Sequence, residues 1–403
     1  MADTELQLPG FPMPRTDPLA PPPAYALWRE GPPRRVQLPL GDQPWLLTRH
    51  ADVRAALADA RLSADSRNPK LPRMVPLPPG PSRVSFLRMD DPEHGVLRRM
   101  LTPEFTLRRV NEMRPGIQQT VDRLIAEMAA VDGPVDLVES FSLPLPALVI
   151  CQLLGVPHAD QPFFQHNIEI ISTVSEDSAE VAEAFGQLAR YLDELTAAKE
   201  ADPGEDLLGR VAARYVAAGE LDHEQLVAMA RLLLVAGNDA TANMIAMAVL
   251  TLLRHPDQLA QLRADPGLVP SAVDELLRFL SVSQNGMVRV ATADLEIGGQ
   301  LIAADDGVLF SLLAANHDED AFENASELRI LRDSRSHVAF GHGAHQCLGK
   351  SLARVELQIA LTSLLAAFPD ISLAVDFDRL RFHFDSFVYG VDELPVFLGK
   401  EPA

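Results

Sequence analysis

Apolar residues recur every three or four positions through most of the chain beyond residue 94. This spacing is typical of helices that bury one face. It predicts helices over 94–113, 114–131, 145–154, 160–173, 177–200, 223–254, 256–263, 268–280 and 349–367, with Pro256 marking the end of the longest one. A shorter helix is expected over 53–60.

Short strand-like runs occur at 44–48, 288–310 and 371–398, and Gly298 and Gly299 mark a turn within the second. Residues 1–40 are rich in proline and are expected to lie over the surface, while 64–82 read as a long loop. No internal repeat interrupts this pattern. The sequence therefore predicts a mainly α fold with small β-sheets, in a single domain over 1–403.

The apolar stretch 232–253 is long enough to cross a bilayer. It carries Asn238, Asp239 and Asn243 near its middle, and a central Asp costs roughly 2.5–3.5 kcal/mol on insertion scales. No basic flank marks a cytoplasmic side. The stretch is therefore expected to be a long helix in the core of a soluble protein.

The balance of charge narrows the possible partners. The 403 residues include 35 Lys and Arg against 56 Asp and Glu, a net charge of −21. Such a chain binds nucleic acid or anionic membranes poorly unless it carries a local basic face. The first residues contain neither a basic nor an apolar leader segment, so we expect a cytoplasmic protein without a membrane anchor.

The two cysteines, Cys151 and Cys347, are too few for a disulfide framework. Cys151 lies in an apolar run and is expected to be a small buried core residue. Cys347 follows a glycine-rich loop and precedes a predicted amphipathic helix, whose dipole and free amides favour a thiolate. Three uses follow: a nucleophile with His345 or His342 as base, a zinc ligand, or a ligand of haem iron.

The zinc interpretation needs four ligands, and this loop offers at most three without a usual spacing. The nucleophile interpretation leaves Phe340 and the glycines unexplained. A haem explains both, because Phe340 would shield the sulfur and the glycines would let the backbone lie against a flat porphyrin. The stretch 340–349 matches F-G-x-G-x-H-x-C-x-G throughout, including Gly341 and Gly349. It resembles the haem-binding loop of the cytochrome P450 family.

The resemblance implies the fold of that family, with haem b (iron protoporphyrin IX) between the long central helix and the helix after the cysteine loop. Cys347 would be the axial ligand and His345 would contact a haem propionate. His94 and Arg98, spaced four apart on one helix, together with Arg289, look like the other propionate-binding residues of the family. Buried carboxylates need such charge-assisted partners.

Glu275 and Arg278 occupy the position of the structural Glu–Arg pair of the family, before the cysteine loop. We interpret them as architecture that holds this loop. A second arginine usually joins the pair. By sequence, Glu327 occupies its usual position, which leaves open whether Arg329 or another residue completes the network.

The long helix contains Ala236-Gly237-Asn238-Asp239-Ala240-Thr241, which resembles the oxygen-activating segment of the family. Small residues at 236 and 237 would let O2 and substrate approach the iron. Asp239 fills the position of the acid, but Ala240 stands where the alcohol is usual, and the hydroxyl follows one residue later in Thr241. One residue turns a helix by about 100°, so Thr241 does not point where residue 240 would. We expect Asp239 to supply protons, with Thr241 and ordered water or a substrate hydroxyl assisting.

By the layout of the family, the substrate pocket would be lined by 64–90, 160–195, 282–288 and the central helix, with Ala236, Val282, Phe387 and Val388 among its residues. These segments are mostly apolar, which predicts a mainly apolar organic substrate with some polar groups. The resemblance is closest to soluble actinobacterial members that tailor secondary metabolites or oxidise xenobiotics.

Electrons would come from an external ferredoxin and its NAD(P)H-dependent reductase, because the chain shows no flavin domain or iron–sulfur cysteine set. Ferredoxins are usually acidic, so the docking face should be basic, with candidates Arg98, Arg99, Arg108, Arg109, Arg114 and Lys350. Two alternatives stay open: a haem protein that does not oxygenate, favoured only by Ala240, and a haem-free cysteine enzyme with His345 as base.

Overall fold

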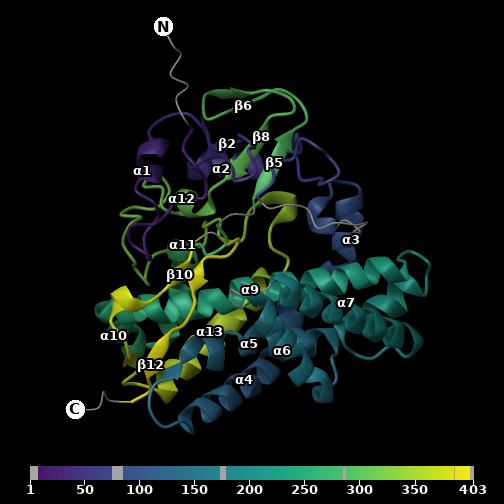
Figure 1. Ribbon diagram of the computed structural model, residues 1–403, viewed down its shortest axis with the longest axis vertical. Helices are drawn as coiled ribbons and strands as arrows, with labels where there is room; N and C mark the ends of the chain where they lie inside the picture. Colours follow the sequence, from purple (N-terminus) through teal and green to yellow (C-terminus); the bar gives the residue numbers. More distant parts are fainter. Residues whose placement is uncertain (1–7, 75–84, 173–177, 285–286, 385, 400–403) are drawn as a thin grey trace. The chain divides into compact units, whose positions relative to one another are not determined.

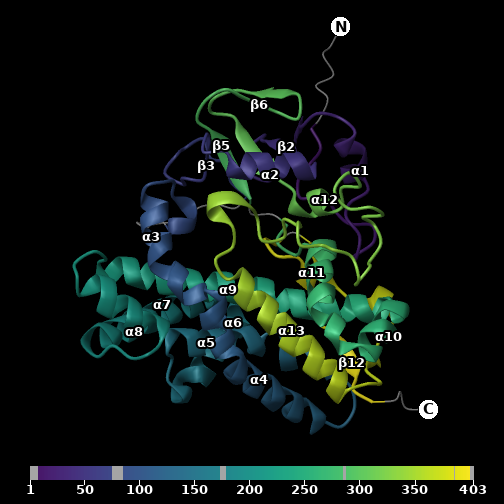
Figure 2. The ribbon, with the colours of Figure 1, turned by 180° about the vertical axis from the view of Figure 1, so that it is seen from behind.

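The computed structural model describes residues 8–74, 85–172, 178–284, 287–384 and 386–399 (Figures 1 and 2). Its internal contacts divide the chain into two units that alternate along the sequence. Unit 1 comprises 1–95, 274–347 and 384–389, and unit 2 comprises 96–273, 348–383 and 390–403. The expectation of one domain over 1–403 stays a prediction.

Unit 1 is built around a five-stranded sheet in the order β1 (Arg34–Arg35), β2 (Trp45–Leu47), β8 (Gly307–Phe310), β5 (Val288–Ala291) and β3 (Leu62–Ser63). Only the β2–β8 pair is parallel. Successive strand residues point to opposite faces, and both faces are apolar here. Leu47 and Phe310 pack with α2 (His50–Ala58) on one face, whereas Leu46 and Leu309 pack with α1 (Ala24–Arg29) on the other.

Three further elements complete unit 1 and confirm the sequence pattern in part. The hairpin of β6 (Leu295–Ile297) and β7 (Gln300–Ile302) turns through Gly298 and Gly299, both with positive φ, as predicted. The helix α12 (Leu312–Asn316) also belongs to unit 1, whereas α11 (Val269–Leu280) begins in a unit 2 segment and ends in a unit 1 segment. The pattern missed α12 and α1 because both are short, and α1 begins directly after a run of prolines.

Unit 2 is a helical bundle around α9 (His223–Arg254), which contacts α5 (Pro144–Leu154), α7 (Ser178–Ala201) and α13 (Lys350–Ala367). In Figure 2, α13 runs beside α4 (Leu107–Ala129). A capping box between Asp222 and Gln225 begins α9 at the predicted residue. Smaller elements complete the unit: α6 (Gln161–Ser172), α8 (Leu207–Val211), α10 (Pro256–Ala264), a sheet of β4 (Val135–Asp136), β12 (Pro395–Phe397) and β9 (Ser372–Leu373), and the hairpin of β10 (Phe382–His383) and β11 (Gly390–Val391).

One predicted helix boundary was wrong. The helices expected over 94–113 and 114–131 are instead α3 (Glu93–Leu101) and α4, separated by a 3-10 turn over Thr102–Phe105. The hydroxyl of Thr106 accepts a hydrogen bond from the amide of Arg109 and caps α4. The predicted break between residues 113 and 114 falls inside α4, where Pro115 removes one backbone hydrogen bond without ending the helix.

The helix α9 is the one helix among the described residues that is long and apolar enough to cross a membrane. In its most apolar window, 67% of the residues are buried inside the protein. A core helix of a soluble protein passes the same test of length and composition, and the burial favours that interpretation.

Candidate active site

The loop before Cys347 is held in shape by glycines with positive φ. Gly341 has φ of 68° and Gly343 of 73°, a region that side-chain-bearing residues rarely adopt. A Cβ on Gly343 would lie 2.4 Å from the carbonyl oxygen of Leu57, so the loop packs directly on the end of α2. By contrast, Gly349 has φ of −82° and open space around it, so its position does not require a glycine for backbone conformation.

Cys347 itself is exposed and lies three residues before the first residue of α13. Its amide donates to the carbonyl oxygen of Phe340 over 2.9 Å, which closes the loop. The ring of Phe340 packs 5.6 Å from that of His337. Cys151 is fully buried, and burial raises the pKa of its thiol to about 12, so the expected inert core cysteine is confirmed.

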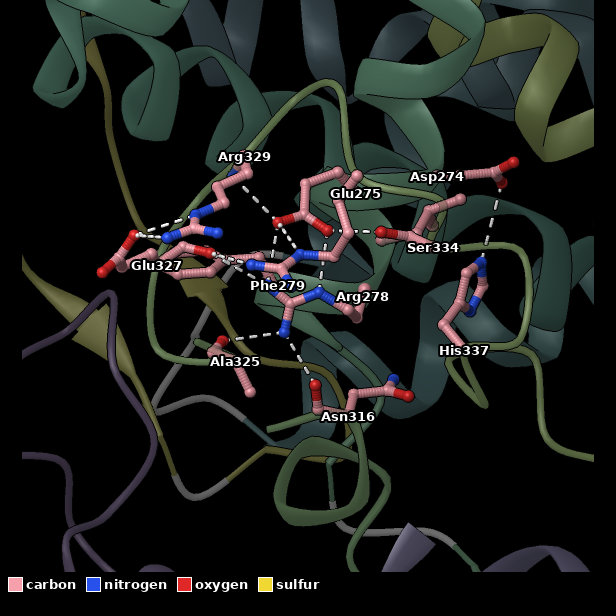
Figure 3. Close-up of polar contacts among 12 residues, drawn as sticks. Asp274, Glu275, Arg278, Phe279, Asn316, Ala325, Glu327, Arg329, Ser334 and His337 are labelled. Atoms are coloured by element: carbon pink, nitrogen blue, oxygen red, sulfur yellow. Dashed lines mark hydrogen bonds and ion pairs between the residues drawn. The ribbon is translucent and has the colours of Figure 1, made fainter. Parts of the chain in front are cut away.

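A buried ion-pair network lies directly upstream of this loop (Figure 3). The side chains of Glu275 and Arg278 are both 0% exposed and form a bidentate pair at 2.8 Å for each bond. Arg278 also donates to the carbonyl oxygens of Asn316 and Ala325, at 2.7 and 2.8 Å. Burial by itself would raise the pKa of Glu275, but hydrogen bonds and the charge of Arg278 outweigh it and hold that pKa below its usual value.

Arg332 completes the network. Its Nε donates to Oε1 of Glu275 over 3.1 Å, and its side chain is 10% exposed. Arg329 contributes only its backbone amide, at 2.9 Å, while its guanidinium pairs with Glu327 on the surface. The question left open by the sequence is therefore answered by Arg332, which lies beyond both Glu327 and Arg329 in the chain.

The network reaches the cysteine loop through Asn316. Its Oδ1 accepts from the amide of Val338 over 2.8 Å, and its Nδ2 donates to the hydroxyl of Ser281 over 2.7 Å. His337, next to Val338, lies 3.7 Å from a carboxylate oxygen of Asp274 (Figure 3). These contacts fix the chain just before Phe340, as expected of a structural rather than a chemical role for Glu275 and Arg278.

Basic side chains of unit 1 form two pairs, His94 with His345 of the cysteine loop and Arg88 with Arg289. The rings of His94 and His345 stack with centroids 4.0 Å apart. Arg289 is 5% exposed, and burial together with the like charge of Arg88 lowers its pKa to about 10. Arg88, which sequence reasoning missed, is itself buried enough to have a lowered pKa. Its signal was weak, since it lies beside the long loop without a recognisable motif.

This donor set fits a haem. Two guanidiniums held in a dry site repel one another, and a pair of carboxylates such as the haem propionates would relieve that cost. Arg98 lies on α3 four residues after His94, in unit 2, and is partly buried. In the part of the chain that the structure describes, no group of three or more His, Cys, Asp and Glu residues could hold a metal ion, which disfavours the zinc interpretation.

The central helix α9 has one buried and one more open face. Ala236 is exposed, and Asp239 and Ala240 are partly exposed on the same side. Thr241 is 7% exposed and lies on the buried side with Asn238, as the 100° rotation per residue predicts. A Cβ on Gly237 would lie 2.6 Å from Cδ1 of Ile150, so this glycine is needed for the packing of α5 on α9.

Asp239 is held by a neighbour one turn further along α9. Nδ2 of Asn243 donates to Oδ1 of Asp239 over 2.8 Å. Burial raises the pKa of the Asp239 carboxyl, an effect opposed by the charge of His383 and by this hydrogen bond. Asp239 is therefore a carboxyl group whose protonated form is favoured by its surroundings.

The expected pocket residues Val282, Phe387 and Val388 come together in unit 1. The amide of Tyr389 donates to the carbonyl oxygen of Val282 over 2.7 Å, and Ser283 pairs with Val388 in an antiparallel bridge. Val282 and Val388 are buried, whereas Phe387 is 41% exposed. Parts of the other expected pocket segments, 75–84, 173–177 and 285–286, lie outside the described residues.

Known proteins resemble this chain over nearly its full length. A family model described as Cytochrome P450 matches residues 205–372. Cytochrome P450-SU2 of Streptomyces griseolus is 48% identical over 91% of each chain. Pentalenic acid synthase of Streptomyces avermitilis is 46% identical over 96% of each. The crystal structure of cytochrome P450 MoxA from Nonomuraea recticatena aligns with a TM-score of 0.92 at 43% identity, covering 98% of this chain and 99% of that one.

These likenesses cover the segments that carry the cysteine loop, the buried Glu275 network and the central helix. Both the sequence relatives and the solved structure are cytochromes P450 or their relatives, which agrees with the basic residues near Cys347 that fit a haem. The chain therefore belongs to the cytochrome P450 family of haem-dependent monooxygenases.

Proposed function

We propose that Cys347 is the axial thiolate ligand of haem b in this monooxygenase, which inserts one oxygen atom from O2 into a mainly apolar organic substrate. The observation that carries the assignment is the exposed sulfur of Cys347 at the end of a loop whose backbone is fixed by Gly341, Gly343 and the Phe340 carbonyl. When bound, a haem with a thiolate ligand supplies the activation of O2. The remaining roles fall to side chains of this chain.

His94, Arg98, Arg289 and His345 hold the two propionates in this proposal, and Arg88 adds a fifth basic group. Each hydrogen bond to a carboxylate is charge-assisted and is worth about 1.5–3 kcal/mol. Phe340, packed on His337, shields the sulfur from water. The stacking of His94 on His345 fixes the orientation of each ring relative to the other.

Asp239 donates the protons that oxygen activation consumes. Burial raises its pKa, so this carboxyl holds its proton more readily than an exposed one, and it lies on the more open face of α9. Thr241 lies on the buried face, which favours Asp239 with water over a direct role for the Thr241 hydroxyl. The absence of a hydroxyl at Ala240 leaves room for a polar group of the substrate on that face.

The substrate class follows from the apolar lining and from a relative. Val282 and Val388 offer buried apolar surface, and Phe387 an exposed ring. The relative named pentalenic acid synthase supports a secondary metabolite as the substrate, and xenobiotics of similar character would fit the same lining. We also propose that the protein is cytoplasmic.

Electrons reach the enzyme from a ferredoxin and its NAD(P)H-dependent reductase. The proposed docking face comprises basic residues of α3, α4 and α13: Arg98, Arg99, Arg108, Arg109, Arg114 and Lys350. The side chain of Arg108 is 80% exposed, whereas Arg109 is paired with Glu112 at 2.9 Å. Arg114 donates to Oε1 of Gln358 and so also ties α4 to α13.

The deciding experiment is the absorption spectrum of the purified protein, reduced by dithionite under carbon monoxide. A Soret band at long wavelength in the native protein, lost in Cys347→Ser, is the expected result. A colourless protein, or the same band in Cys347→Ser, would remove Cys347 as the ligand and favour a cysteine enzyme with His345 as base. A thiolate spectrum without product formation from any substrate would instead favour a haem protein that does not oxygenate.

A further inference from the structure

A line of polar side chains joins the middle of α9 to the β10–β11 hairpin within unit 2. On α9, Nδ2 of Asn243 donates to both Oδ1 and the carbonyl oxygen of Asp239, at 2.8 and 3.0 Å. On the hairpin, Nδ1 of His383 lies 2.8 Å from Oδ1 of Asp392. The side chain of His383 is 17% exposed, so most of the ring is shielded from bulk water.

Gly390 brings these two pairs together. It lies opposite His383 in the register of the hairpin. A Cβ on Gly390 would be 1.6 Å from Oδ1 of Asn243 and 2.8 Å from Nε2 of His383. The two atoms are therefore no further apart than the sum of these distances, and they face one another across the space that the missing side chain leaves. Because Asp392 accepts from Nδ1–H, a protonated His383 presents its Nε2–H toward the Asn243 carbonyl oxygen.

We propose that His383, oriented by Asp392, is a positioning residue that holds Asn243 and thereby the Asp239 carboxyl, and that its charge sets how readily Asp239 gives up its proton. This inference rests on the proposed role of Asp239 as the proton donor. It makes the C-terminal hairpin part of the apparatus that serves oxygen activation, although the hairpin contributes no group to the oxygen-activating segment of α9.

The electrostatics agree with this arrangement. Burial raises the pKa of Asp239, and the charge of His383 is the larger of the two effects that lower it. Arg381 and Glu393, the other charged groups of the hairpin at this end, are 77% and 64% exposed and lie 3.8 Å from one another. Asp392 also lines a surface cavity of about 260 Å³ together with Arg379 and Arg381. Loss of the His383 charge should therefore raise the pKa of Asp239.

The test compares His383→Gln with Arg381→Gln as the matched control on the same strand region. Gln keeps a hydrogen-bonding amide but no charge. The probe reaction is O-dealkylation of 7-ethoxycoumarin with a plant-type ferredoxin and its NADPH-dependent reductase. The measured quantity is product formed per NADPH consumed, from about pH 6 to 9. In His383→Gln the transition of this ratio should move to higher pH, because a nearby opposite charge has been removed, while Arg381→Gln should leave it unchanged.

Unchanged profiles in His383→Gln and the control alike would overturn the inference. A merely structural role is separated by two readouts: the reduced carbon monoxide spectrum and the binding constant of 7-ethoxycoumarin should both stay as in the native protein. Asp239→Asn provides the second arm. If this variant does not alter the ratio, the proposed role of Asp239 fails; if it does and His383→Gln does not, only the role of His383 fails.

The double variant Asp239→Asn/His383→Gln tests the route of the effect. If His383 acts through Asp239, the double variant should match Asp239→Asn within error at every pH, since no titrating carboxyl remains for His383 to influence. An additional loss in the double variant would show an independent role of His383 and contradict the proposal. Gly390→Ala gives a steric version of the same test, because its Cβ would displace the Asn243 amide, and it should reproduce the upward shift.

Discussion

The imidazole rings of His94 and His345 stack with their centroids 4.0 Å apart and their planes 28° from parallel. One ring comes from the start of α3 and the other from the cysteine loop, so a single contact joins two of the proposed propionate ligands. Loss of either ring should therefore also weaken the contact of the other ring with its propionate. We expect His94→Ala and His345→Ala each to speed haem loss by about 10-fold or more, because a charge-assisted hydrogen bond is worth about 1.5–3 kcal/mol.

Transfer of haem to apomyoglobin measures this rate. In the double variant, the free-energy change calculated from the rate of haem loss should be smaller than the sum of the changes in the two single variants, as expected for residues in contact. Full additivity would show that the stack does not couple the two rings. His158→Ala, at an exposed position on unit 2, is the control and should leave the rate unchanged.

Arg332→Ala and Arg329→Ala form a matched pair in the segment that precedes the cysteine loop. Arg332 contacts the fully buried carboxylate of Glu275, and removal of one partner of a buried ion pair costs about 3–5 kcal/mol. Arg329→Ala removes only a surface pair with Glu327 and should cost less than about 1 kcal/mol. Urea unfolding of the two variants measures the difference. Equal destabilisation would contradict the assignment of Arg332 to the network.

Gly343→Ala and Gly349→Ala separate a required glycine from a dispensable one. Gly343 has a positive φ, and its Cβ would meet the Leu57 carbonyl oxygen at 2.4 Å, so alanine should displace the loop and reduce haem incorporation severalfold. Gly349 has open space and an ordinary φ, so alanine should be tolerated. The ratio of Soret to protein absorbance checks both. Normal haem content in Gly343→Ala would show that the loop can shift without loss of its ligand.

Glu356 on α13 makes stability depend on pH. It is 3% exposed, its Oε2 has no hydrogen-bond partner among the described residues, and burial raises its pKa to about 8. The unfolded carboxyl releases its proton near pH 4.5, so between pH 4.5 and about 8 the folded state binds more protons. Stability should therefore fall as the pH rises through this window and then level off.

Glu356→Gln should flatten this decline and stabilise the protein at pH 8 by a few kcal/mol, because one pKa unit corresponds to about 1.4 kcal/mol. Thermal unfolding of the holoprotein across this pH range measures it. Glu127→Gln, at an exposed position of α4, should retain the decline of the native protein. A decline that persists in Glu356→Gln would assign it to other groups.

Charge reversal at Arg108 tests the proposed docking face. Its side chain is 80% exposed and its distance to Glu112 is 4.0 Å, so the variant Arg108→Glu should fold normally. At low ionic strength, ferredoxin-driven reduction should slow by about 10-fold, and the difference should shrink as salt is added. Stopped-flow formation of the reduced carbonyl complex measures the rate. Arg190→Glu on α7 is the control; an equal loss there would point to net charge rather than to a specific face.

Sequence reasoning was most successful where local pattern and chemistry coincide. The bounds of α9 could be predicted because an apolar run, the cap at Asp222 and the proline after His255 agree. The cysteine loop could be recognised because its glycines and Phe340 are constrained by a single stretch of backbone. Cys151 could be assigned to the core from its apolar neighbours alone.

The errors share a different cause. Arg332 and Arg88 act through tertiary contacts with residues far away in the sequence, and no local spacing reveals which arginine turns inward. The break predicted between residues 113 and 114 does not exist, because α4 continues through Pro115 and its packing against α13 compensates for one lost hydrogen bond. The sequence did not indicate the importance of Gly390 either, because the need for a glycine there comes from its close contact with Asn243 on another element.

The alternation of the two units along the chain has a consequence for biosynthesis. Because the ribosome releases the chain from its N-terminus, unit 1 lacks its last segment, 384–389, until all of the preceding 383 residues have emerged. Unit 2 likewise waits for 390–403. Neither unit can therefore complete its contacts early in synthesis. The part of α9 that β11 contacts stays uncovered until residues 390–391 have emerged.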